Sequence, residues 1–305
     1  MAGVTREAFN AHIRPGLRKD FRMYYDALGE EELGGFLKVG TMDKPEIQAT
    51  IMTGVSRMFE KDELESVTFS TPIAGPVIGG IDKEFGVGVA IGRKIWEDEQ
   101  YGKLKEAGKW LANAHRQTRE YRAAGFLDDA FTGATYTGID GLPLISASHT
   151  FLNAAGTWSN LAPAVSLSIA AMTSLIDIFG LMKNHDGDPI RMMLDKLVVG
   201  NDANTIHTAM QILNTQKEPF TADNNDNMIK KRLGSVDLVI SRYKTSRVNY
   251  FGIDNKWNDA HFLVRRAARM DDEMDFKTDA ALFKLTTRFL IWHVEARGWA
   301  GANAV

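Results

Sequence analysis

The chain contains no cysteine among its 305 residues. Disulfides, zinc–thiolate centres, iron–sulfur clusters and cysteine nucleophiles are therefore excluded. An excess of basic charge is also missing, since 36 Lys and Arg residues against 39 Asp and Glu residues give a net charge of −3. Binding to nucleic-acid phosphates is not what this composition favours. Stability must come from apolar burial and, if the chain oligomerises, from contacts between subunits.

Long apolar runs are missing as well. The longest, residues 167–182, is interrupted by Ser168, Thr173, Ser174 and Asp177, and none reaches the roughly 20 apolar residues of a membrane span. The amphipathic first 21 residues contain no apolar signal-peptide core. With 44% hydrophobic and 25% charged residues, the chain has the composition of a folded protein with a sizeable core. We expect a protein that is made and kept in the cytoplasm and binds no membrane.

Two helices are predicted in the first 60 residues. Apolar side chains recur at three- and four-residue spacing over residues 5–32, which is typical of an amphipathic helix, and Pro15 is expected to break or bend it near its start. A second helix is predicted between Pro45 and Phe59, with Asp43 and Lys44 preceding it. The first helix is supported by Phe9, Ile13, Leu17, Phe21, Tyr24 and Tyr25.

A glycine-rich excursion follows at residues 66–92. Phe85, Val87, Val89 and Ile91 alternate with small or polar residues at period two, which is typical of a strand. We expect two strands joined by a turn at Gly79–Asp82. An isolated two-stranded ribbon is marginally stable in water, so we expect this excursion to pack on another subunit rather than on its own chain.

The strongest helix in the sequence is predicted from Trp96 to about Phe126. Thirty-odd residues would extend about 45 Å. Glu97, Asp98 and Glu99 would occupy its first turn, where the helix dipole favours negative charge. One stripe is expected to be buried, comprising Tyr101, Leu104, Ala107, Gly108, Leu111, Ala114, His115, Thr118, Tyr121, Gly125 and Phe126.

The remaining chain alternates helices and strands, which predicts an α+β fold. Residues 136–161 are rich in loop-forming types, and 185–189 has the composition of a turn. Helices are predicted over Pro163–Lys183, with Ser166 or Ser168 as N-cap, and over Asp202–Asn214. Strands are predicted at Ile190–Val199, Val236–Ser241, Val248–Ile253, His261–Val264 and Ala281–Val294.

Four segments together resemble the major head proteins of tailed bacteriophages. Lys94–Gly102 (KIWEDEQYG) is similar to the start of their long "spine" helix, and Arg119–Phe131 is similar to its end. Asp140–His149 (DGLPLISASH) and Gly156–Leu161 (GTWSNL) are similar to the loop after that helix. The order of elements over residues 60–300 resembles the Hong Kong 97 capsid fold.

This resemblance implies a domain organisation. It comprises an N-terminal arm with helices at 1–59, an extended loop at 60–92 that lies over a neighbouring subunit, and a peripheral domain formed by 93–160 and 271–305. Residues 161–270 would form an axial domain around each capsomer's symmetry axis.

The implied function is a major capsid protein that assembles as hexamers and pentamers into an icosahedral head around the phage genome. The alternative is an encapsulin-type nanocompartment shell, which resembles the same fold but encloses protein cargo. Neither reading implies catalysis, a cofactor or a metal.

The implied partners are other copies of the chain, a portal, possibly a decoration protein, and packaged double-stranded DNA bound without sequence specificity. The chain starts at its arm, which predicts a separate scaffolding protein unless an N-terminal extension was cleaved. The resemblance places the protein in the virion after assembly in the host cytoplasm.

Ser148, His149 and Asp140 are the residue types of a hydrolase triad. A Gly-x-Ser-x-Gly elbow is missing, and adjacent Ser and His residues rarely face each other as nucleophile and base. We therefore expect loop residues that cap turns.

Gly86–Gly92 superficially resembles a dinucleotide-binding motif, but its spacing is Gly-x-Gly-x-x-x-Gly and acidic residues open the following helix. A strand is the expected structure.

His185, Asp186 and Asp188 could suggest a metal site, but the later ligands of a calcium loop are missing and a turn is expected. Asp271, Asp272, Glu273 and Asp275 form an acidic run that predicts a solvated bend. At an interface this run could also meet Arg265, Arg266 and Arg269.

Some members of the resembled family cross-link a lysine of the extended loop to a neighbour's asparagine. Lys61 and Lys83 lie in that segment, and no partner asparagine is identifiable.

Overall fold

The computed structural model describes residues 14–27, 31–55, 57–58, 60–67, 69, 71–92, 103–220, 225–275 and 277–304. Its helices are α2 (Arg14–Ala27), α4 (Lys103–Asp128), α5 (Ile169–Gly180), α6 (Ala203–Asn214) and α7 (Met228–Leu233), with short 3-10 turns η2 (Glu32–Gly35) and η3 (Asp129–Phe131). Its strands are β1 (Lys38–Thr41), β2 (Glu46–Met52), β3 (Ala74–Ile81), β4 (Lys83–Ile91), β5 (His149–Thr150), β6 (Thr157–Trp158), β7 (Lys196–Gly200), β8 (Asp237–Ser241), β9 (Tyr250–Ile253), β10 (Ala260–Met274), β11 (Ala281–His293) and β12 (Trp299–Ala302).

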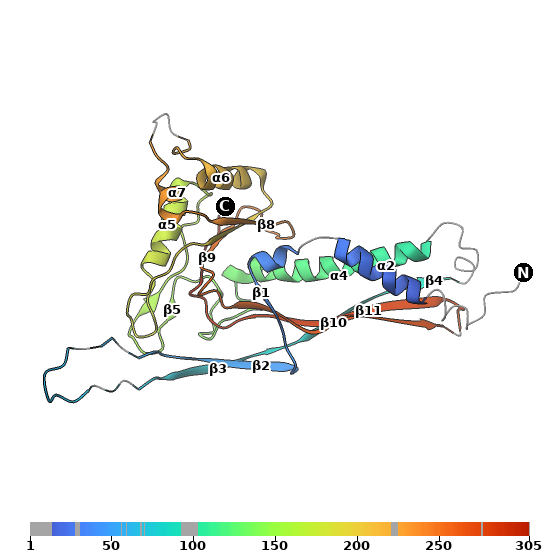
Figure 1. Cartoon of the computed structure of the whole chain (residues 1–305), viewed down its shortest axis with the longest axis horizontal. Coiled ribbons are helices and arrows are strands. Elements are labelled where there is room, and N and C mark those ends of the chain that lie inside the picture. The colour runs from blue at the N-terminus through green and yellow to red at the C-terminus, as the bar shows by residue number, and fades with distance from the viewer. Residues whose placement is uncertain are drawn as a thin grey trace, which may run out of the picture.

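A long, narrow sheet forms the body of the molecule. Its strand order is β1-β10-β11-β4, with β10, β11 and β4 antiparallel and β1 parallel to β10. Helix α4 lies along one face of this sheet, and α2 packs on α4 (Figure 1). The 26 residues of α4 extend about 39 Å. The long helix predicted here is confirmed over residues 103–128, whereas Trp96–Tyr101 lies outside the described residues.

The buried stripe of α4 follows the predicted phase only in part. Ala107, Leu111 and Phe126 are fully buried, as expected. Tyr121 is 60% exposed, however, while Glu120 beside it is 2% exposed. Glu120 is held inside because its Oε1 accepts a 2.6 Å hydrogen bond from the backbone N–H of Glu32. The predicted burial of Tyr121 is therefore wrong, and its ring instead packs at a tilted angle against Tyr243, with 5.0 Å between ring centroids.

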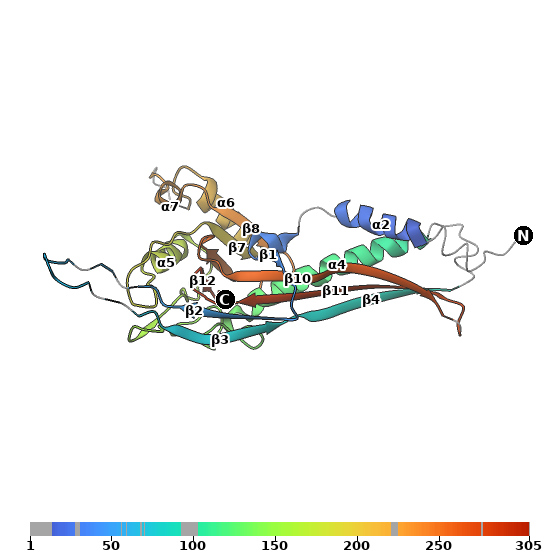
Figure 2. The same cartoon turned by 60° about the horizontal axis from the view of Figure 1, so that its bottom comes forward.

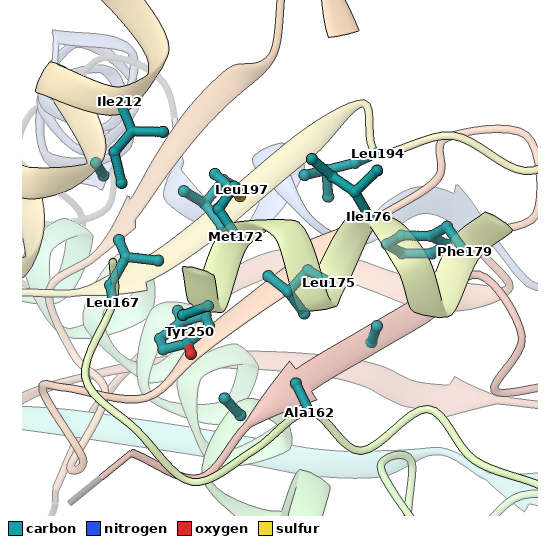
Figure 3. Packing of buried hydrophobic residues seen from close by; sticks show 14 of the residues in the cluster. Ala162, Leu167, Met172, Leu175, Ile176, Phe179, Leu194, Leu197, Ile212 and Tyr250 are labelled. Carbon is teal, nitrogen blue, oxygen red and sulfur yellow. The ribbon is translucent and has the colours of Figure 1, made fainter. Parts of the chain in front are cut away.

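A second, smaller sheet has the order β12-β9-β7-β8. Helices α5 and α6 pack beside it around an apolar core in which Met172 and Leu175 of α5 and Leu197 of β7 are fully buried. Figure 3 shows these side chains gathered with Tyr250 of β9. This unit stands at one end of the long sheet (Figure 1).

Local capping explains where the helices of this unit begin. The hydroxyl of Ser168 accepts from Ala171 N, and the carboxylate of Asp202 accepts from Thr205 N. Each interaction satisfies a backbone N–H that a helix start leaves free. The predicted helices at 163–183 and 202–214 are confirmed, the first with narrower bounds. The strand predicted at 190–199 is confirmed only at 196–199, since β7 begins at Lys196.

The helix predicted between Pro45 and Phe59 is wrong, because β2 occupies residues 46–52. Ile47, Ala49 and Ile51 alternate with more exposed neighbours along this strand. Period two is the signal of a half-buried strand. The side of β2 that carries these three residues packs against β11 residues Leu290 and Trp292.

The turn predicted at Gly79–Asp82 does not form a hairpin. Strand β3 pairs with β2, at Ile47↔Gly80 and Thr50↔Val77, whereas β4 pairs with β11. The chain passes from one pairing to the other at Asp82, so β3 and β4 follow one another in one long line (Figure 2). The hairpin that projects from the molecule is β2–β3, and β4 is an edge strand of the long sheet.

Candidate functional site

The most exposed apolar surface of the described chain lies at the end of the β2–β3 hairpin. We call residues 53–73, which join β2 to β3, the hairpin tip. Its described side chains include Met58, Leu64 and Phe69, which are 101%, 97% and 90% exposed. Val55, Val67 and Ile73 add to this surface. The tip extends away from the rest of the chain (Figure 1), and exposed apolar patches of this kind mark interaction sites. Lys61 lies in this segment.

The base of the same hairpin is anchored on its own chain. Ile47 and Ile78 pack against a cluster that contains Leu290 and Trp292. Strand β4 is also internal, since Phe85 stacks on Phe289 with 4.4 Å between ring centroids. The prediction that residues 66–92 pack on another subunit instead of their own chain is therefore wrong for β4 and for the hairpin base. The long sheet supplies the partners that a lone ribbon would lack.

A buried ionic cluster holds the hairpin base to the sheet. The side chain of Asp82 is 0% exposed, and its Oδ2 lies 2.6 Å from Arg288 Nε. Its Oδ1 lies 3.1 Å from Arg265 Nη1, and its backbone N–H donates to Pro45 O. A buried carboxylate is stable only when paired, and these two arginines, from β10 and β11, provide that pairing.

Asp140 and His149 come together, as a triad would require, but Ser148 does not join them. The Nδ1 of His149 lies 2.6 Å from Asp140 Oδ2, and the His149 ring stacks on Trp158 across the β5–β6 pair. Burial raises the pKa of Asp140, but the hydrogen bond and charge of His149 outweigh this effect and hold that pKa below its ordinary value. Within the described chain, His149 Nε2 has no hydrogen-bond partner, so no bond links it to Ser148. Asp140 Oδ1 accepts from Leu142 N, which confirms its predicted role in a turn.

The predicted turn at residues 185–189 is confirmed. The Asn184 side chain accepts hydrogen bonds from the N–H groups of Asp186 and Asp188, and Gly187 has a φ of +89°. The two carboxylates diverge, because Asp186 binds Asn153 and Asp188 binds Arg57 of the hairpin tip at 2.8 Å. His185 points elsewhere, toward Arg297.

Gly86–Gly92 is confirmed as strand, with residues 86–91 in β4.

A buried polar cluster around Arg297 has no counterpart in the sequence prediction. Arg297 is 1% exposed and donates to Lys183 O at 2.8 Å and to His185 Nε2 at 2.7 Å. It also pairs with Glu295 and lies 5.0 Å from the Trp158 ring centroid. Burial and the nearby Arg297 charge lower the pKa of His185 to about 4. No spacing rule joins residues 185 and 297, so only the fold could bring them together.

The acidic run at 271–275 lies mostly in a strand. Asp271 to Glu273 belong to β10, and only Asp275 lies at the bend, where it caps Lys277 N and the Thr278 hydroxyl. The predicted solvated bend is therefore confirmed only at its end. Of the three arginines considered, Arg269 pairs with Asp271 at 3.0 Å, whereas Arg265 and Arg266 pair with Asp82 and Glu84.

Among the described residues, no helix has the length and apolar character needed to cross a membrane. No group of three or more acidic, histidine or cysteine side chains in that part of the chain could hold a metal ion.

The fold is similar to those of several solved structures. The capsid of a native gene-transfer-agent (GTA) particle is similar, with a TM-score of 0.56, 14% identity and 89% of each chain covered. A solved structure from Microbacterium phage Oxtober96 has a TM-score of 0.55 and 9% identity over 91% of this chain and 92% of that one. A virus-like particle from Pyrococcus furiosus has a TM-score of 0.52 and 10% identity over 94% and 98%.

Among proteins with curated descriptions, none matches this sequence. A family model described as phage capsid protein matches residues 81–302. That match spans most of the chain, including the whole smaller sheet and every strand of the long sheet except β1, and the similar structures share the Hong Kong 97 fold. This chain therefore belongs to the phage capsid protein family and is a capsid shell protein.

Proposed function

We propose that this chain is the major capsid protein of a tailed bacteriophage and assembles as hexamers and pentamers into an icosahedral head. The head encloses double-stranded DNA, which the chain does not read by sequence. The net charge of −3 fits a shell that contains DNA without attracting it strongly. The protein works by repeated contact between copies, without a catalytic residue, a cofactor or a metal.

The observation that carries this proposal is the hairpin tip. Its exposed apolar side chains include Leu64 and Phe69, and burying a large apolar side chain contributes about 1.5–3 kcal/mol. In a free subunit this surface faces water, whereas a neighbouring copy would cover it. A hairpin with an anchored base and a projecting tip is suited to bridging two neighbouring subunits.

Electron microscopy of the purified protein, made with the other head proteins of its phage, tests the proposal. We expect closed shells from the wild type. Replacing residues 57–69 by a short Gly-Ser linker should abolish shells while leaving a folded subunit, since the base is held separately by Asp82 and by Ile47 and Ile78. Met210→Ala, at an exposed position of α6, is the matched control and should assemble normally. Shells that form without the tip would contradict the proposal.

Further partners belong to the same proposal. A separate scaffolding protein would guide assembly in the host cytoplasm, a portal would occupy one vertex, and a decoration protein could bind the finished head. Residues 93–160 and 271–305, with α4 and most of β11, would form the peripheral domain, and residues 161–270, with β7, β8 and β9, the axial domain. Two strands cross these bounds, because β12 (Trp299–Ala302) pairs with β9 and β10 (Ala260–Met274) pairs with β11 along its length. The hairpin tip would be the extended loop.

An encapsulin-type shell is the second candidate, and the similarity to the Pyrococcus furiosus virus-like particle favours it. The phage capsid family match over residues 81–302 weighs against it. Particle content separates the two proposals. DNA together with a portal supports the phage head, and an enclosed enzyme supports the nanocompartment.

A further inference from the structure

We propose that a cavity beside strand β3 binds a small uncharged molecule that carries a carboxamide group. The cavity measures about 260 Å³. It lies where Pro76 of β3, the loop around β5 and β6, the turn at His185 and residues 294–297 meet. We call it the neck cavity. The Asp140–His149 pair and the Arg297 cluster, which are far apart in the sequence, both border it.

The charged groups at the neck cavity are already paired. Arg297 is 1% exposed and pairs with Glu295, and Asp140 Oδ2 lies 2.6 Å from His149 Nδ1. His185 adds no charge at neutral pH, because burial and the charge of Arg297 lower its pKa to about 4. A charged ligand would find no unpaired counter-charge among these residues, and burying an unpaired charge is costly. The cavity therefore favours an uncharged ligand.

Two stacked rings at the cavity wall each retain an unused polar atom. The rings of His149 and Trp158 stack with 4.4 Å between centroids. Among the described residues, neither His149 Nε2 nor the indole N–H of Trp158 has a hydrogen-bond partner, and His149 is 1% exposed. A buried donor or acceptor without a partner is costly. An occupant that satisfies both atoms would therefore stabilise the folded subunit.

The hydrogen-bonding roles of these two atoms are complementary. His149 Nδ1 faces the carboxylate of Asp140 and therefore carries the ring proton, which leaves Nε2 of the neutral ring as an acceptor. The indole nitrogen of Trp158 can only donate. A carboxamide matches both, because its carbonyl oxygen accepts from Trp158 and its N–H donates to His149. A carboxylate or a ketone lacks the donor, and an alkylammonium group lacks the acceptor.

The rest of the wall is apolar and limits the size of the ligand. It includes Pro76, Ile139, Leu152, Val294 and Ala296. A cavity of about 150 Å³ accommodates benzene, so one of about 260 Å³ accommodates roughly 10 non-hydrogen atoms. A carboxamide on one compact ring therefore suits this cavity, with the ring against the apolar wall.

The occupant would connect segments that are distant in the sequence. Pro76 belongs to the strand that carries the hairpin, Leu152 to the loop between β5 and β6, and Val294 to the segment that follows β11. A ligand that binds only the folded chain stabilises it by mass action. Binding would thereby fasten the hairpin to the two other segments.

Titration of the full-length subunit with benzamide tests the inference. The chain has six tryptophans, and the indole signal that Trp158→Phe removes from the proton–nitrogen NMR spectrum belongs to Trp158. Benzamide should shift that signal and leave the signal of Trp110, which is 53% exposed on α4, unchanged. Acetophenone has a methyl group in place of the amide nitrogen. It should bind about tenfold more weakly because it cannot donate to His149.

Two variants separate the two hydrogen bonds. Trp158→Phe keeps a ring and removes the donor, so it should weaken the binding of both compounds by about tenfold. His149→Phe removes the acceptor, so it should weaken benzamide by about tenfold and leave acetophenone unchanged. His207→Phe, at an exposed position of α6, is the matched control and should change neither. Calorimetry measures the affinities, and circular dichroism confirms that each variant folds.

Two outcomes would overturn the inference. If benzamide does not shift the Trp158 signal, the neck cavity holds water only. If benzamide and acetophenone bind the wild type equally well, no ligand donor reaches His149. This second comparison needs no variant, so it decides the question even if His149→Phe does not fold. Neither outcome affects the proposed function, which is tested by the assembly of particles.

Discussion

Arg288 Nε lies 2.6 Å from Asp82 Oδ2 at the corner where the chain leaves the hairpin and enters the long sheet. The carboxylate is fully buried, while the Arg288 and Arg265 side chains are 29% and 24% exposed. The pairing ties the corner at which the hairpin leaves the sheet to both β10 and β11. It thereby links a local ionic contact to the place where the hairpin, whose tip is the proposed contact surface, leaves the sheet.

Removing this carboxylate should destabilise the subunit. Asp82→Ala leaves two partly buried guanidinium groups facing each other, and breaking a buried ion pair in this way costs about 3–5 kcal/mol. Because both arginines reach solvent, we expect the lower end of that range. Glu84→Gln, which removes a pair between half-exposed side chains, is the matched control and should cost under about 1 kcal/mol. Urea unfolding measures both, and equal losses would contradict the role of Asp82.

The packing of α4 predicts a second difference. Leu111 is 0% exposed in the cluster between α4 and the long sheet, so Leu111→Ala should reduce the free energy of unfolding by about 2–5 kcal/mol. Asn113 lies on the exposed face of the same helix, and Asn113→Ala should change it by under about 0.5 kcal/mol. Chemical denaturation of both variants tests the helical phase. A similar loss at Asn113 would show that this phase is wrong.

Acid should destabilise the subunit through its buried histidines. Burial and the charge of Arg119 lower the pKa of His115 to about 4, while burial lowers that of His293 to about 4. The ordinary value of about 6.5 applies in the unfolded chain. Between these values the unfolded state binds more protons, so stability is complete above about pH 6.5 and is lost as the pH falls toward 4.

A single substitution isolates one of these contributions. His115→Phe keeps a ring against Tyr25, whose centroid lies 5.2 Å away. We expect the dependence of unfolding free energy on pH to become shallower by up to about 1.4 kcal/mol per pH unit between pH 6.5 and 4. Urea titrations at several pH values measure this slope. An unchanged slope would show that His115 does not contribute.

The Asp140–His149 pair should affect stability and not chemistry. Ser148 is exposed, so Ser148→Ala should change the free energy of unfolding by under about 0.5 kcal/mol and leave particle assembly intact. Asp140→Ala strips His149 of its 2.6 Å partner and should cost about 1–3 kcal/mol. In a catalytic triad, Ser148→Ala would instead have a large effect on the reaction rate, since removing the nucleophile alone loses most of that rate. An ester-hydrolysing activity of the wild type that disappears in Ser148→Ala would overturn this prediction.

Sequence alone determined the features that depend on neighbours along the chain. The 3.6-residue pattern around Leu111 predicted the long helix, and the Ser168 and Asp202 signals predicted where α5 and α6 begin. The turn at residues 185–189, with Gly187 at its centre, was likewise predicted from its local composition. Each involves interactions within a few residues, so local pattern and capping chemistry are sufficient.

The tertiary structure decided which strands pair and which surfaces are free. Strand β4 pairs with β11, with Phe85 opposite Thr287, and no local rule selects a partner about 200 residues away. The burial of Leu290 and Trp292 then decides that residues 46–52 become a strand on the sheet. Lys83, Arg122 and Trp292 line one cavity only because that arrangement packs distant segments together. Non-local pairing and packing, unlike capping, depend on the whole chain at once, and this is why the sequence could indicate a shell protein but not which part of the glycine-rich excursion projects from it.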